Sequence, residues 1–180
     1  MRGTALSVLP AALLLAGCGA TTVRVAVGPT LDSSGHAGVV STLSLGVGFP
    51  VDFHGRSKHY VQGLASVGGG RDGATGAGVV VAATDLDYIH WAEPRNMDVR
   101  AGLHFAAQNL PATSTSRYGF GAHAGVLPMV YQDNTTWLVT HVCVGPELRG
   151  EALSGNPAGG ALGVFSLPLV TELNWLGAGD

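Results

Sequence analysis

The feature that most constrains this chain is an alternation of apolar residues with polar or small ones. Every second residue from Met97 to Phe105 is apolar, and the residues between them are polar or small. The pattern recurs in 43–49 and in 165–175, where Thr171 alone interrupts the apolar face. Because successive side chains of a β-strand point to opposite faces, these segments are predicted to be strands with one apolar and one polar face.

The alternation is broken at regular intervals by Gly, Pro, Asn, Asp and Ser, which mark turns. It predicts eight strands and no helix beyond residue 17. Most exceed the 5–6 residues usual in globular proteins and reach the 9–11 that a tilted transmembrane strand needs. The expected fold is all-β, an antiparallel up-and-down β-barrel of about eight strands, at 22–28, 37–49, 59–68, 76–91, 97–108, 117–131, 136–148 and 160–175.

The composition suits a wall that faces lipid. Charged residues make up 12% of the chain and hydrophobic residues 46%, whereas soluble proteins average about 25% charged. The formal charge is −3, which excludes the strongly basic balance of nucleic-acid partners.

The first residues have the features of an export signal. The apolar run 5–16 is too short to span a bilayer and contains Pro10, and the sequence across its end is Leu15-Ala16-Gly17-Cys18. This ending resembles the lipobox of bacterial lipoproteins. The resemblance implies removal of 1–17, acylation of Cys18, and a membrane-lipid anchor for a single β-barrel domain at 18–180. By the same resemblance, Gly19 favours the outer membrane, with the N-terminus on the periplasmic side.

A periplasmic N-terminus assigns each link between strands to the periplasmic or the outer side of the membrane. The links 50–58, 92–96 and 132–135 are expected to be periplasmic, and the last two are short. The outward links are expected to be longer and rich in Gly, Ser, Thr and Pro, at 29–36, 69–75, 109–116 and 149–159.

Aromatic residues gather at the predicted periplasmic strand ends. They are expected to form an interfacial girdle, or else to close one end of a soluble β-sandwich. Trp137 shares a strand face with His141 and Glu147, so a bulge would be needed to turn it outward. The set comprises Trp91, Trp137 and Trp175, with Phe49, Tyr60 and Tyr131.

Together these patterns resemble the small eight-stranded outer-membrane barrels of Gram-negative bacteria. Those barrels commonly end on an aromatic residue, whereas this chain continues past Trp175 through Leu-Gly-Ala-Gly-Asp. The departure leaves a lipid-tethered periplasmic β-domain that binds a ligand or partner as an alternative.

An eight-stranded barrel has an interior just wide enough to be filled by side chains. We expect its inward charges to pair, because burial of an unpaired charge is costly. A lumen ion-pair network is the default, and a catalytic or proton-handling site is the other interpretation. The candidates are Asp85, Asp87, Arg100, His104, His141, Glu147 and Glu172.

Motifs that carry chemistry are sparse. His104, His123 and His141 lie on successive strands, and whether the last two share a face depends on the turn near Asp133. No HExxH-like spacing occurs, so no metal and no cofactor are predicted. Cys143, left without a partner once Cys18 is acylated, is expected to be buried and inert.

One arrangement has a catalytic parallel. His141, Cys143 and Glu147 resemble the His/Ser/acid arrangement of outer-membrane lipid A deacylases, although that family uses a serine and a different acid spacing. A lipid-modifying enzyme is therefore a second alternative. The sequence favours a non-enzymatic, lipid-anchored outer-membrane barrel with a structural or interaction role.

Overall fold

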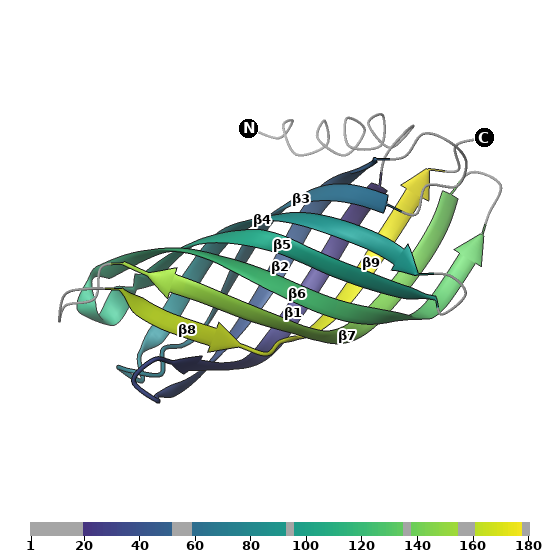
Figure 1. Cartoon of the computed structure of the whole chain (residues 1–180). Coiled ribbons are helices and arrows are strands. Elements are labelled where there is room, and N and C mark those ends of the chain that lie inside the picture. The colour runs from purple at the N-terminus through teal and green to yellow at the C-terminus, as the bar shows by residue number, and fades with distance from the viewer. Residues whose placement is uncertain (1–19, 52–58, 93–95, 135–137, 155–160, 178–180) are drawn as a thin grey trace, which may run out of the picture.

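The protein is a closed, all-antiparallel ring of strands, in a computed structural model that describes residues 20–51, 59–92, 96–134, 138–154 and 161–177. Neighbouring strands pair in chain order, and β1 closes the ring by pairing with β2 on one side and with β8 and β9 on the other (Figure 1). The predicted up-and-down barrel is confirmed. Its strands are β1 (Ala20–Asp32), β2 (Ala37–Pro50), β3 (His59–Arg71), β4 (Gly78–Ala92), β5 (Met97–Leu110), β6 (Thr115–Asn134), β7 (Leu138–Leu153), β8 (Leu162–Ser166) and β9 (Leu169–Gly177).

The eighth position of the ring is occupied by two short strands. We predicted one strand at 160–175, but β8 and β9 are separated at Leu167 and Pro168. Proline has no N–H for the ladder, so the pairing stops there. Opposite the break, a Cβ on Gly28 would lie 2.4 Å from the Cα of Pro168, so the close approach requires glycine.

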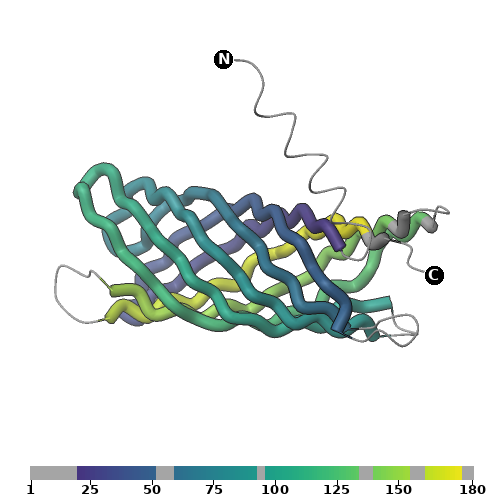
Figure 2. The backbone as a smooth tube through the Cα atoms, turned by 90° about the horizontal axis from the view of Figure 1, so that it is seen from above, coloured from purple at the N-terminus to yellow at the C-terminus, as the bar shows by residue number. Residues whose placement is uncertain are grey.

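The barrel has a shear of ten residues. A row of paired residues that starts at Thr30 in β1 passes through β8, β7, β6, β5, β4, β3 and β2 and returns to β1 at Ala20. A stagger of this kind requires strands tilted to the barrel axis, as Figure 2 shows.

Several strands run further than the sequence indicated. β1 and β7 were predicted at 22–28 and 136–148, and both continue at the end of the barrel that carries the turns 33–36, 72–77 and 111–114. We call this the distal end, and the end with Ala20 and Gly177 the proximal end. The prediction of long outward links was wrong for these three turns.

Two glycines of the predicted link 69–75, Gly69 and Gly70, belong to the β3 ladder. Gly68 and Gly70 pair with β2, and a Cβ on Gly70 would lie 1.9 Å from the carbonyl oxygen of Val39. The glycine run at 68–70 therefore allows two strands to approach closely.

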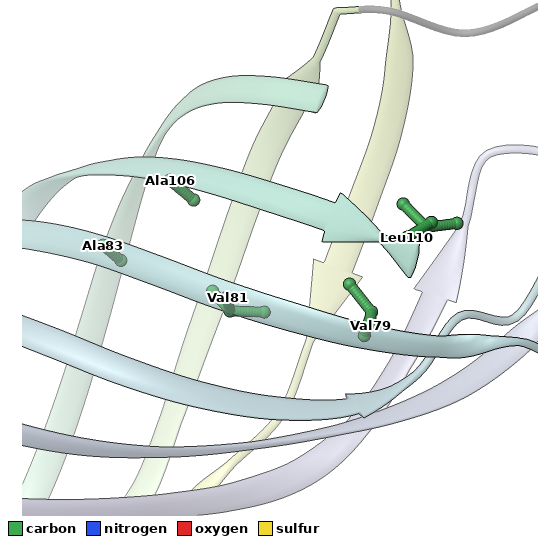
Figure 3. Packing of buried hydrophobic residues seen from close by; sticks show 5 residues of the cluster. All are labelled: Val79, Val81, Ala83, Ala106 and Leu110. Atoms are coloured by element: carbon green, nitrogen blue, oxygen red, sulfur yellow. The ribbon is translucent and has the colours of Figure 1, made fainter. Parts of the chain in front are cut away.

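The two faces of the wall are opposite in character. Outward side chains are mostly large and apolar, and inward ones mostly polar or charged. The interior also holds an apolar cluster of β4 and β5 toward the distal end, shown in Figure 3, which consists of Val79, Val81, Ala83, Ala106 and Leu110. Within the described ranges, no helix is long and apolar enough to cross a membrane.

Candidate functional site: the charged interior

Two arginines from different strands share one carboxylate in the middle of the barrel. Arg24 Nε donates to Glu172 Oε2 at 2.8 Å, and Arg100 Nη2 donates to Glu172 Oε1 at 2.9 Å. All three side chains are fully buried. Strand alternation aims them inward from β1, β5 and β9, so closure of the ring brings together residues far apart in sequence.

Further acidic groups surround the arginines. Asp87 accepts a hydrogen bond from Arg24, and its other oxygen lies 2.8 Å from Nε2 of His123. Oδ2 of Asp98 lies 3.4 Å from Nη2 of Arg100. The arginine charges are thus opposed by several carboxylates, the condition under which buried charge is tolerated.

A third arginine extends the network. Nε and Nη2 of Arg149 donate to Glu147 Oε1 at 2.8 and 2.7 Å. The other oxygen of Glu147 lies 4.0 Å from Arg24 Nη1. Glu147 therefore links the central arginines to the distal part of the interior.

Asp85 lies close to two histidines, His104 and His123. It bonds Nδ1 of His104, and the same oxygen lies 4.0 Å from Nδ1 of His123. His104 Nε2 in turn faces Glu151 Oε2 at 3.6 Å. A carboxylate–histidine–carboxylate line thus runs from the network toward the distal end.

A cavity of about 70 Å³ lies at the distal end, next to His104 and Glu151. His104, Arg149 and Glu151 contribute to its lining, and so do Val79 and Val81 of the apolar cluster. A volume of this size holds a few water molecules. The interior thus consists of a short pocket at the distal end and, on the proximal side of this pocket, a region filled by ion pairs.

The distal rim carries its own ion pair. Arg117 Nη1 donates to Asp72 Oδ1 at 2.7 Å, and the Asp72 carboxylate also accepts hydrogen bonds from Thr75. Burial alone would raise the pKa of Asp72, but the hydrogen bonds from Thr75 and Arg117 outweigh it and hold that pKa below its usual range.

The proximal part of the interior contains an aromatic and apolar region. His141 is 5% exposed and packs on Trp91, with ring centroids 4.3 Å apart and planes inclined by 31°. Trp91 also packs on the buried cluster that contains Leu127 and Cys143. The Cys143 thiol is free and fully buried.

Trp91 therefore does not contribute to an outward girdle. It has the strand parity of Asp85 and Asp87, which directs it into the barrel, and this corrects its assignment as an interface aromatic. Trp175 occupies an outward position beside Thr21. Trp137, like Cys18, lies outside the described residues.

All seven predicted lumen residues point inward, but they do not form one cluster. Asp85, Asp87, Arg100, His104, Glu147 and Glu172 belong to the network, whereas His141 stands apart at the proximal end. His141 and Glu147 are six residues apart on β7, which is about 20 Å along a strand, so a joint catalytic role is not supported.

Sequence reasoning missed Arg24, Asp98 and Arg149 as members of the network. The signal for Arg24 was present, because it alternates with outward Val23 and Val25 in β1. Of the three histidines that were considered together, His104 and His123 converge on Asp85 and His141 does not. In the described part of the chain, no group of three or more His, Cys, Asp or Glu side chains is arranged to hold a metal ion.

The fold and interior define an antiparallel barrel of eight positions with an apolar exterior and a charged core. No protein-family model matches the sequence, and no curated protein sequence matches it. The structure is similar to the crystal structure of Neisserial surface protein A (NspA), with a TM-score of 0.51 and 12% identity. The similarity covers 87% of this chain and 95% of NspA, and at this identity it concerns the fold.

Proposed function

We propose that the protein is an integral outer-membrane β-barrel, additionally anchored by acyl chains on Cys18, with a structural or interaction role. The observation that carries this proposal is the outward wall. Among the described strand residues, outward Asp, Glu, Lys and Arg occur only near strand ends, at Arg71 and Asp133. A band free of charge is what the hydrocarbon core of a bilayer requires.

Aromatic residues support the same proposal. Phe49, Tyr88 and Tyr131 are about half exposed toward the proximal end. Toward the distal end, Phe105 pairs with Phe120 on the outer face, and Tyr118 lies two residues beyond. Two outward aromatic groups separated by aliphatic side chains match the interfacial girdles of membrane barrels.

The interior supports a role without conduction. An eight-stranded barrel leaves little free space, and the ion pairs of Arg24, Arg100 and Glu172 occupy the middle of it. An interaction role would then use the distal surface and the cavity beneath it.

Membrane insertion is tested by gel migration without boiling. A folded membrane barrel should migrate differently before and after heating, and should stay in membranes that are washed with alkaline carbonate. Identical migration before and after heating would contradict the proposal and favour a tethered periplasmic domain.

Lipid anchoring is tested separately with Cys18→Ser. The parent should incorporate a labelled palmitate and the variant should not. Because the barrel itself holds the protein in the membrane, the variant should remain carbonate-resistant. Loss of Cys18→Ser from the membrane would show that the lipid alone holds the protein there.

A further inference from the structure

The geometry points to a surface site for a divalent transition-metal ion at the proximal end of the barrel, formed by His59 and His90. These histidines face each other as a register pair, the first in the β3–β4 ladder. Outward positions of β4 include Leu86 and Tyr88, and His90 continues that series. Both imidazoles therefore lie on the outer face, away from the lumen network.

The distance between the two ring nitrogens fits metal coordination. Nδ1 of His59 and Nδ1 of His90 are 3.3 Å apart. Zinc binds histidine nitrogen at about 2.0–2.1 Å with tetrahedral geometry, which places two such ligands about 3.3–3.4 Å apart. The rings are stacked with centroids 4.6 Å apart and planes inclined by 27°, so a rotation about the soft χ2 torsions is needed before both nitrogens face one ion.

A third donor lies beside the pair. The hydroxyl oxygen of Tyr88 is 2.6 Å from Nδ1 of His59, and the two rings are stacked at 5.8 Å. A phenol oxygen and two imidazole nitrogens form a donor set that suits late first-row divalent ions and not Mg²⁺ or Ca²⁺, which prefer several oxygens. We name Zn²⁺ and Cu²⁺ as the ions, with Cu²⁺ bound more tightly.

The site is open to solvent. Both histidines are half-buried, and Tyr88 is 47% exposed. Both rings lie on the outer face, so an ion would approach them from outside the barrel. The proposal does not depend on the membrane proposal, since it rests only on side chains of β3 and β4.

The test is a titration of the full-length protein, purified in detergent, with ZnCl₂. We expect one Zn²⁺ per barrel and no response to MgCl₂. His59→Ala and His90→Ala should each weaken Zn²⁺ binding by at least about tenfold, the lower end of the effect of removing even an outer-shell group. His36→Ala, which removes a histidine at the distal end, is the matched control and should bind as the parent does.

Spectroscopy of the Cu²⁺ complex gives a second readout. Electron paramagnetic resonance of the parent should show coupling to two imidazole nitrogens, and His90→Ala should retain one. A circular dichroism spectrum that matches the parent's establishes that each variant is folded. The proposal is overturned if the parent does not bind Zn²⁺, if both histidine variants bind it unchanged, or if His104→Ala abolishes binding and they do not.

Discussion

The inner and outer faces of the same strands follow opposite rules. In β4, Leu86 is 55% exposed, whereas its neighbours Asp85 and Asp87 are 4% and 1% exposed. In a soluble protein the apolar residue would be buried and the charged ones exposed. Here charged side chains fill the interior, the place that apolar side chains occupy in a soluble protein, and apolar side chains form the surface.

The two faces also differ in what a substitution costs. An inward charge depends on partners contributed by distant strands, so removing one leaves the others buried and unpaired. An outward aliphatic side chain has no such partners. The cost of replacing it depends on whether the outer face contacts lipid or water. Substitutions on the two faces therefore test separately the buried ion pairs and the proposed contact of the outer wall with lipid.

The largest effect is expected for Glu172→Ala. The substitution leaves the guanidinium groups of Arg24 and Arg100 without their shared acceptor, and breaking a buried ion pair costs about 3–5 kcal/mol. The free energy of unfolding, from urea titration of the protein in lipid vesicles, measures this cost. Glu172→Gln, which keeps the volume and one acceptor oxygen, is the control and should cost less. An unchanged urea midpoint for Glu172→Ala would show that the interior network does not stabilise the barrel.

The next effect is expected on the outer face, with Leu86→Arg. Leu86 lies near the middle of β4, and an arginine facing lipid at the bilayer midplane costs about 2–4 kcal/mol. Leu31→Arg, one residue from the distal end of β1, should cost about 0–1 kcal/mol. The same urea titration in vesicles measures both. Equal and negligible costs would contradict a lipid-facing wall, because exposed surface substitutions of soluble proteins are usually near neutral.

The face of the charged strand residues could be predicted from the sequence. Strand alternation assigns Asp85, Asp87, Arg100, His104, Glu147 and Glu172 to the interior without knowledge of the barrel. The strand predicted at 97–108 is close to β5 (Met97–Leu110). Where alternation is long and regular, the local sequence determines both strand and face.

The partners across the lumen could not be predicted. Arg24 and Glu172 are 148 residues apart, and they meet because the ring closes with a shear of ten. That stagger depends on all the strand registers together, including the break at Pro168 and the register shift between Met129 and Tyr131. Glycine, which marks turns in most contexts, also misled the boundaries, because at Gly28 and Gly70 it serves close strand packing.

The smallest effect is expected at the distal rim, at the ion pair of Asp72 and Arg117. The side chains of Asp72 and Arg117 are 10% and 4% exposed, and Asn keeps one acceptor oxygen. Asp72→Asn should therefore cost less than the loss of a carboxylate that two arginines share. Because the folded pKa of Asp72 is lowered, its contribution is fully present above the ordinary aspartate pKa of about 3.9 and is lost as the pH falls through the lower, folded value. The difference in urea midpoint between parent and Asp72→Asn should therefore be constant near neutral pH and shrink in acid. Asp133→Asn, at the proximal end, is the matched control. A difference for Asp72→Asn as large as that for Glu172→Ala would mean that the rim pair is as dependent on its partners as the buried network.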